Sequence, residues 1–291
     1  MRSAEAESGR RAHGVRDAVF AFWPMRRAMR LERNLYYNNR MTPTKAFLEK
    51  TYKEMNRAEF IHPDPLEFVW RYKSAADREV VGLIAACLAY GNVNQILKSV
   101  EKVLAPMGKS PAQWIKSTPP AEVKKGLAKF KHRFTTGAEM AVFLLNIKRA
   151  MGEYGSLEKL FLKGYDAKEP TVEEALYRFI NAFNTQACAP TLTPCPEHKS
   201  SFKRLNLFLR WMARKDAVDP GVWTGVSPSK LLIPLDTHMR QVSMGMGITR
   251  RKDTSMKTAV EITAFFAGVN PADPVKYDFA LTRAGIRGNN T

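Results

Sequence analysis

Two side chains that could do chemistry, Lys203 and Asp236, each lie where a helix is expected to begin. Lys203 follows a proline-rich loop and falls in the first turn of its helix, where the helix dipole opposes a positive charge. This position, with Arg204 beside it, favours the neutral amine, which is the form that attacks a sugar carbon or a carbonyl. The alternative interpretation is an ordinary surface lysine.

Asp236 lies near the middle of the segment Leu232–Arg240 and is expected to cap a helix. Pro234 prevents an earlier helix from continuing, and the Asp236 carboxylate can accept free amide hydrogens of the next turn. Apolar residues then recur at helical spacing, namely Met239, Val242 and Met246. Most capping aspartates have no chemical role, so a catalytic role needs support from other parts of the chain.

The segment Ser200–Arg214 combines an apolar stripe with a row of cations. The stripe consists of Phe202, Leu205, Leu209 and Met212. Another face of the expected helix carries Lys203, Arg210 and Arg214. If the apolar side packs into the protein, the three cations point together into a groove and can hold an anionic partner. The alternative is a solvated basic face.

The composition indicates a globular protein with an anionic partner. Its 291 residues are 45% hydrophobic, enough for one large core or for two smaller cores that share a cleft. Lys and Arg outnumber Asp and Glu by 46 to 28, and the net charge of +18 is spread along the chain. This charge favours a polyanion such as nucleic acid, although a basic protein without that role has a similar composition.

Cysteine content and hydropathy predict a cytoplasmic protein. The chain has three cysteines, too few for the disulfide framework of a secreted protein of this length, and a reducing compartment fits best. The longest apolar run, residues 80–90, has about half the length of a membrane span. We therefore expect no transmembrane segment and no membrane partner.

Helix start and stop signals recur along the chain while strand signals are scarce, which predicts an all-α fold. Asp64 and Glu67 form a capping-box pattern, Asn94 can cap a helix, and Asp273 can cap the last one. The expected helices span residues 64–72, 77–90, 94–104, 111–117, 120–130, 137–152, 156–163, 171–183, 201–215, 236–247, 254–267 and 273–284.

Residues 1–40 differ in composition from the rest of the chain, with nine arginines, four acidic residues and no lysine. Three interpretations fit: an arginine-rich arm that touches nucleic acid, a targeting peptide, or an annotated start too far upstream, with Met41 as the true start. We favour the third and expect this extension to be disordered if it is present.

The order of several passages is similar to that of one enzyme superfamily. These passages are the apolar helix and polar turn Val80–Asn94, the short motif Phe130–Phe134, the helix start Pro234–His238 and the final helix Asp278–Ile286. Together with a lysine at the start of an earlier helix, they resemble the helix-hairpin-helix DNA glycosylases, which excise damaged bases. Residues 41–287 resemble more closely a family of uncharacterised bacterial and archaeal proteins, with the block Lys203–Met212 and the helix start Leu235–His238 as the clearest marks.

The resemblance implies an all-α fold of two helical lobes with a cleft between them. One lobe would comprise residues 41–78 and 240–291, and residues 79–239 would form the lobe that carries the active site. The proline-rich loop 189–199 replaces the usual glycine hairpin, and the interval to the aspartate is long, as in an archaeal 8-oxoguanine glycosylase branch. Lys203 is the expected counterpart of the catalytic lysine, with Arg204 and Lys199 as alternatives.

The resemblance also implies roles for the site residues. Asp236 would stabilise positive charge on the sugar, and Lys203 would form a Schiff base at the anomeric carbon. Expected contacts with phosphates are Lys98, Lys102, Arg133, Arg204, Arg210, Arg214, Lys230 and His238. For His238 the alternative is a structural role. The pocket for an extruded base would include Tyr90, Asn92, Gln95 and Trp211.

The sequence therefore predicts a monomeric DNA repair glycosylase, with or without lyase activity. The expected nucleic acid is DNA, with RNA as the alternative. A non-catalytic nucleic-acid-binding protein on the same scaffold is the alternative from another class. No cofactor or metal is expected, because the cysteines that hold an iron–sulfur cluster in the superfamily follow its last helix and this chain has none there. Cys188, Cys195 and His198 imitate part of a ligand spacing but lack a fourth partner.

Overall fold

The computed structural model describes residues 42–194 and 201–288, and it is mostly helical, which confirms the all-α prediction. The helices are α2 (Lys45–Met55), α3 (Glu67–Trp70), α4 (Ala75–Cys87), α5 (Val93–Leu104), α6 (Pro111–Ser117), α7 (Pro120–Leu127), α8 (Gly137–Tyr154), α9 (Leu157–Lys163), α10 (Glu173–Phe183), α11 (Lys203–Ala213), α12 (Thr237–Gly245), α13 (Met256–Val269) and α14 (Asp278–Gly288). None of the described helices has both the length and the apolar character needed to cross a membrane.

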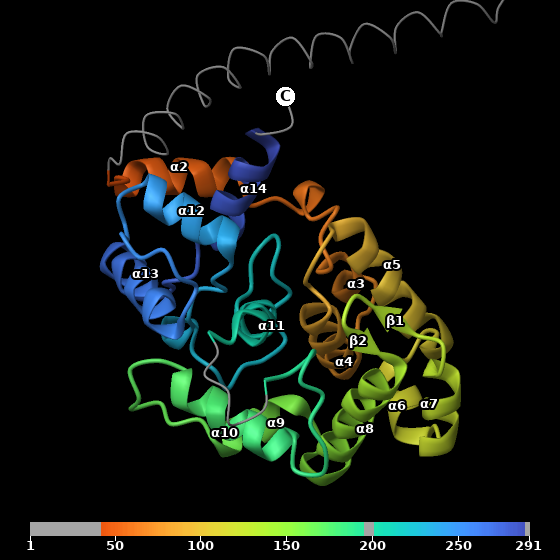
Figure 1. The fold of residues 1–291 in the computed structure, drawn as a ribbon. Coiled ribbons are helices and arrows are strands. Elements are labelled where there is room, and N and C mark those ends of the chain that lie inside the picture. Colours follow the sequence, from red (N-terminus) through yellow and green to blue (C-terminus); the bar gives the residue numbers. More distant parts are fainter. Residues whose placement is uncertain (1–41, 195–200, 289–291) are drawn as a thin grey trace, which may run out of the picture.

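Helix α11 lies in the middle of the molecule and joins two groups of helices (Figure 1). The first described helix, α2, packs against α14, and α14 packs against α12, so the two ends of the described chain meet on one side. The helices from α3 to α8 lie on the other side of α11, and the main contact of α11 with them is α4. Nearly all buried apolar residues belong to one continuous cluster that runs through both groups.

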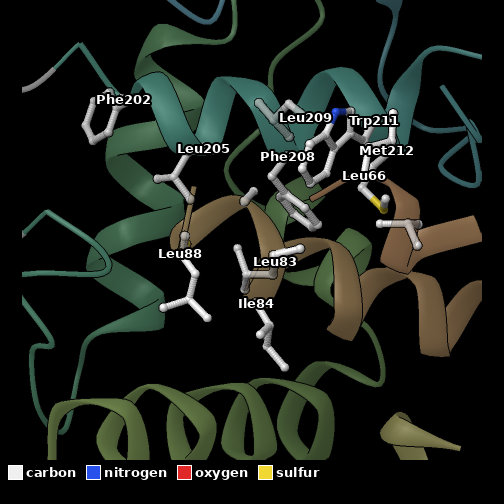
Figure 2. Close-up of a cluster of buried hydrophobic side chains, with 14 of the residues drawn as sticks. Leu66, Leu83, Ile84, Leu88, Phe202, Leu205, Phe208, Leu209, Trp211 and Met212 are labelled. Carbon is white, nitrogen blue, oxygen red and sulfur yellow. The ribbon is translucent and has the colours of Figure 1, made fainter. Parts of the chain in front are cut away.

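The contact between α4 and α11 positions the start of α11. Helix α4 is buried on all sides from Glu79 to Cys87, as its apolar sequence predicts. The predicted stripe of α11 is buried as well, and Phe208 and Met212 lie over α4 (Figure 2). Gly82 allows the close approach, because a Cβ atom there would lie 2.9 Å from Met212 Cε and 3.4 Å from Phe208 Cε2.

Replacing Gly82 with valine is expected to lower the free energy of unfolding by about 1–3 kcal/mol, since the added methyl groups overpack this contact. Urea denaturation measures the change. Gly126 on α7 provides the matched control, because a Cβ atom there meets nothing within 4 Å. Gly126→Val should change stability by less than about 0.5 kcal/mol. Equal effects of the two substitutions would contradict the packing argument.

Several helix boundaries differ from those predicted. Asn92 caps α5 in place of Asn94, because its extended backbone lets the side chain accept from the amides of Asn94 and Gln95. Ser74 caps α4, which places Asp77 inside the first turn. Helix α3 is short, and its first turn lacks the expected capping box.

The last helix begins later than predicted, at Asp278 instead of Asp273. Asp273 does not cap it, because its carboxylate accepts from Arg214 Nε at 2.9 and 3.0 Å. Two elements were not predicted from the sequence: α2, which Thr44 caps, and a two-stranded antiparallel hairpin of β1 (Lys131–His132) and β2 (Thr135–Thr136). The prediction for residues 1–40 lies outside the described residues.

Candidate active site

The structure brings Lys203 and Asp236 together from two different helix starts. Lys203 is the first residue of α11, and Asp236 is the N-cap of α12, as predicted. Lys203 Nζ lies 3.6 Å from Asp236 Oδ2, and the two side chains are 30% and 38% exposed. The pair is therefore an ion pair that solvent and a ligand can both reach. Lys203 Nζ also lies 3.4 Å from the carbonyl oxygen of Ala89.

Asp236 uses its two carboxylate oxygens for different purposes. Its backbone is extended, and Oδ1 accepts the amide hydrogen of Met239 at 2.7 Å, which caps α12. Oδ2 is the oxygen that faces Lys203. Capping therefore orients the second oxygen toward Lys203.

Substitutions at Asp236 can separate the cap from the charge. Asp236→Asn is expected to change stability by less than about 0.5 kcal/mol, because asparagine caps helices as well as aspartate does. Asp236→Ala should cost about 1 kcal/mol, since the amide of Met239 loses its acceptor. Thermal or urea unfolding measures both values. If the asparagine variant lost as much stability as the alanine variant, the charge of Asp236 and not its cap would stabilise the fold.

The start of α11 has an uncommon backbone. Phe202 precedes Lys203 with φ 49° and ψ 29°, in the left-handed region that residues other than glycine rarely adopt. Its ring is buried and packs edge-on against Tyr177 at 4.7 Å between centroids, which holds this conformation. The Asn206 side chain donates to the carbonyl of Ser201 and ties the approach segment to the helix. The alternative lysine, Lys199, lies outside the described residues.

A cavity of about 350 Å³ adjoins the Lys203 side chain. Tyr90, Phe134 and Thr191 contribute to its wall, and Lys203 and Arg204 supply its positive charge. The remaining described lining residues are mostly apolar, namely Ala89, Pro190, Pro194, Ser201, Phe202 and Leu205. An apolar cavity with a few converging polar groups is typical of a binding site for a small ligand or an extruded base.

A hydrogen-bond chain makes one wall of this cavity rigid. The Tyr90 hydroxyl lies 2.9 Å from the carbonyl of His132 and 2.5 Å from Thr135 Oγ1. The chain continues from Thr135 to Thr191 at 2.7 Å and from Thr191 to Glu139 at 3.0 Å. Burial would raise the pKa of Glu139, but hydrogen bonds from Thr136 and Thr191 outweigh it and lower the pKa, so the chain ends on a carboxylate.

Arg204 binds the loop before α11 to the end of α4. Its Nη1 donates to the carbonyls of Cys87 at 2.9 Å and Thr191 at 2.5 Å, and its guanidinium lies over the Tyr90 ring. Burial raises the pKa of the Cys87 thiol to about 12, so this thiol is not a nucleophile. Arg204 thus shapes the cavity next to Lys203, and it cannot form a Schiff base.

Two predicted phosphate contacts, Arg210 and Arg214, are wrong. Both are 3% exposed and form buried ion pairs with four carboxylates, those of Asp216, Asp219, Asp273 and Asp278. The sequence showed a polar face on α11, but acids of the loop after α11 and the distant acids Asp273 and Asp278 cover that face. Trp211 is also corrected, because its fully buried side chain belongs to the core and is not part of the described lining of the cavity beside Lys203 (Figure 2).

Other predicted contact residues lie on the surface. Lys98, Lys102 and Arg133 are exposed, as are Asn92 and Gln95, which line no described cavity. Arg133 has φ 51° and lies over the ring of Phe134, which is 73% exposed. Phe134 and Thr191 were not predicted as site residues, although Phe134 belongs to the motif Phe130–Phe134.

Two further predicted contacts bind protein atoms. Lys230 Nζ donates to the carbonyl of Glu169 at 2.7 Å. His238 Nε2 lies 3.2 Å from the carbonyl of Thr282 on α14, which fits the structural alternative. Among the described residues, no group of three potential ligands is close enough to hold a metal ion. Cys188 is disulfide-bonded, and Cys195 and His198 lie outside the described residues.

Comparison with known proteins gives a family and no activity. No curated protein and no solved structure matches the chain. The model of one family, described as protein of unknown function (DUF2400), matches residues 64–287. The match covers α3 to α14, including the helices that start at Lys203 and follow Asp236. The predicted membership in an uncharacterised family is therefore confirmed, and the chain belongs to the DUF2400 family.

Proposed function

We propose that this protein is a DNA glycosylase in which Lys203 and Asp236 act on the sugar of a damaged nucleotide. One observation carries the proposal: an amine and a carboxylate from two helix starts lie 3.6 Å apart, both partly exposed. The adjoining cavity of about 350 Å³ supports it, since an extruded base needs a pocket beside the sugar. The resemblance of the sequence to the helix-hairpin-helix DNA glycosylases supports the same activity.

The two residues would have complementary roles. Breaking the bond between the sugar C1′ and the base nitrogen builds positive charge on the sugar, which the Asp236 carboxylate would stabilise. The electron pair of that bond leaves with the base, which takes up a proton from water, and the Lys203 amine, after giving its proton to solvent, forms a new bond to C1′. Opening of the sugar ring then yields an imine between Lys203 and the DNA, from which β-elimination can cleave the strand.

The cavity wall would receive the base. Tyr90 and Phe134 offer aromatic surface for stacking, and Arg204 can donate hydrogen bonds from nitrogens other than the one bound to the Cys87 and Thr191 carbonyls. Tyr90 is held by its hydrogen bond to Thr135, so this surface exists before the ligand arrives. Such preorganisation lowers the cost of binding.

The exposed cations of α5 would hold the phosphate backbone. We expect Lys98→Gln/Lys102→Gln to reduce the slope of log affinity against log salt by about 2, because each lysine that contacts a phosphate releases about one counterion. Fluorescence anisotropy with duplex DNA at several salt concentrations measures the slope. Lys159→Gln/Lys163→Gln on α9 removes two exposed lysines with the same spacing far from α5 and should leave the slope nearly unchanged. Equal slopes for both double variants would remove α5 from the interface.

Borohydride trapping tests the proposed activity. The full chain is incubated with duplexes that carry single lesions, covering oxidised, deaminated and alkylated bases and an abasic site, with borohydride present. A covalent adduct establishes Schiff-base chemistry, and base release without an adduct establishes a monofunctional glycosylase. DNA binding with neither outcome would favour the non-catalytic binding protein, and absence of binding, release and adduct would overturn the proposal.

A further inference from the structure

Three cations lie in a row along α11, and each meets a carboxylate from another segment; Lys203 and Arg210 belong to the helix, and Arg214 is its C-cap. Lys203 faces Asp236 of the α12 start, and two turns later Arg210 pairs with Asp278, the first residue of α14. Arg214 pairs with the acids of the loop after α11 and with Asp273. Two ion pairs along one side of α11 therefore connect this helix to the starts of α12 and α14.

Arg210 is the buried centre of this arrangement. It is 3% exposed and binds two carboxylates at once, with Nη1 on Asp278 and Nε and Nη2 both 3.2 Å from Asp219 Oδ1. Asp278 and Asp219 are 3% and 0% exposed. A guanidinium that bridges two buried acids has one geometry, so it fixes the distance between α11 and the start of α14.

Helix α14 in turn holds the first turn of α12. The two helices pack against each other, and His238, two residues after Asp236, makes its hydrogen bond to Thr282 of α14. The two carboxylates also interact through their charge. Burial raises the pKa of Asp278, Arg210 opposes this rise, and the charge of Asp236 adds to it. Each of the two acids pairs with its own cation of α11, Asp236 with Lys203 and Asp278 with Arg210.

We propose that the buried Arg210–Asp278 ion pair is a positioning pair for the candidate active site: it fixes α14, and through α14 the start of α12, so that Asp236 faces Lys203. Arg210 touches no ligand in this arrangement and acts through Asp278 and α12. The inference rests on the proposed function for the reaction, but the geometry that it describes exists without DNA. The row of cations that the sequence assigned to DNA thus contains one reactive residue and one positioning residue.

Charged side chains from α11 and from the loop after it surround this arrangement. Lys203 pairs with Asp236, Arg210 bridges Asp278 and Asp219, and Arg214, the C-cap of α11, also pairs with Asp219. Arg214 offers the matched control for Arg210. It is as deeply buried and shares Asp219 with Arg210, but it forms no ion pair with Asp278.

The experiment compares Arg210→Lys with Arg214→Lys in the full chain. Lysine keeps the positive charge, so the variants are expected to fold, which circular dichroism verifies. Lysine lacks the planar guanidinium that bridges two acids, so the geometry of the bridge is lost. Single-turnover trapping measures the chemical step, and anisotropy measures DNA affinity. A third readout needs no DNA: pyridoxal phosphate with borohydride labels lysines, and mass spectrometry gives the ratio of labelling at Lys203 to that at exposed Lys98.

Arg210→Lys is expected to slow adduct formation at least about tenfold while DNA affinity changes little, because a small misplacement of reacting groups has that effect on the chemical step alone. Labelling of Lys203 relative to Lys98 should rise about threefold, as the amine loses a partly exposed ion pair. Arg214→Lys should leave the rate of adduct formation and the labelling ratio of Lys203 to Lys98 near those of the parent protein. Equal behaviour of the two variants in the labelling ratio would overturn the inference.

The failure of the proposed function is distinguishable from the failure of this inference. If the parent protein forms no adduct and releases no base, the proposed function fails, and the labelling ratio alone then decides on the positioning pair. If the parent forms an adduct but Arg210→Lys forms it at the parental rate, the function stands and the positioning role fails. If either lysine variant does not fold, Asp278→Asn replaces Arg210→Lys, and Asp273→Asn replaces Arg214→Lys. The labelling ratio of Lys203 to Lys98 should then rise for Asp278→Asn and stay near the parental value for Asp273→Asn.

Discussion

Replacing Lys203 with glutamine is expected to abolish the borohydride-trapped adduct, with a loss of about 1000-fold or more in the rate of its formation. Glutamine has no amine that can form an imine, yet its length and polarity let it keep contact with the carbonyl of Ala89. DNA affinity should fall by less than about tenfold, because one partly exposed cation contributes little binding energy. Denaturing electrophoresis of the trapped complex and anisotropy of the free protein measure the two quantities.

The control for this substitution is Lys98→Gln, which removes an exposed lysine of α5 and leaves the amine of Lys203 in place. It should weaken binding and preserve the adduct that forms at saturating DNA. An adduct that persists in Lys203→Gln would assign the nucleophile to another amine, and peptide mapping of the adduct would then identify it.

Replacing Arg214 with methionine is expected to lower the free energy of unfolding by about 3–5 kcal/mol, because it leaves buried carboxylates without their cation. Arg214 is 3% exposed and pairs with Asp216, Asp219 and Asp273. Burial would lower its pKa, but these acids outweigh burial and raise it, so the guanidinium stays charged. Asp219 is the most affected acid, since burial already raises its pKa to about 6. Urea denaturation at neutral pH measures the loss.

The same substitution at an exposed arginine provides the comparison. Arg71 also pairs with two acids, Glu67 and Glu101, but its side chain is 46% exposed. Arg71→Met should cost less than about 1 kcal/mol, because solvent and salt already screen these pairs. A small loss for Arg214→Met, similar to that for Arg71→Met, would show that the buried network contributes little to stability.

Local patterns in the sequence predicted the features that depend on neighbouring residues. The Asp236 cap is one example, since its partner is the amide of Met239 three residues away. The apolar stripe of α11 is another, because helical periodicity decides which side chains share a face. Boundaries were less predictable: Asn92 and Asn94 are both good caps, and the choice depends on which backbone is extended.

Patterns of charge were read incorrectly where distant segments decide the outcome. Lys203, Arg210 and Arg214 look alike in the sequence, as three cations on one face of an amphipathic helix. Only Lys203 is partly exposed, because the start of α14 and the loop after α11 cover the other two with acids. Periodicity reports that a face is polar, and it contains no information on whether that face meets water or another part of the chain.

By itself the sequence determined that a helix starts at Lys203 and that another helix starts after Asp236, because prolines, caps and apolar spacing act over a few residues. It did not determine that the amine and the carboxylate meet. Their distance of 3.6 Å depends on how α11, α12 and α14 pack, and on the buried Arg210–Asp278 ion pair between α11 and α14. Helix starts are local events, whereas the distance between two of them is set by contacts between residues far apart in the chain.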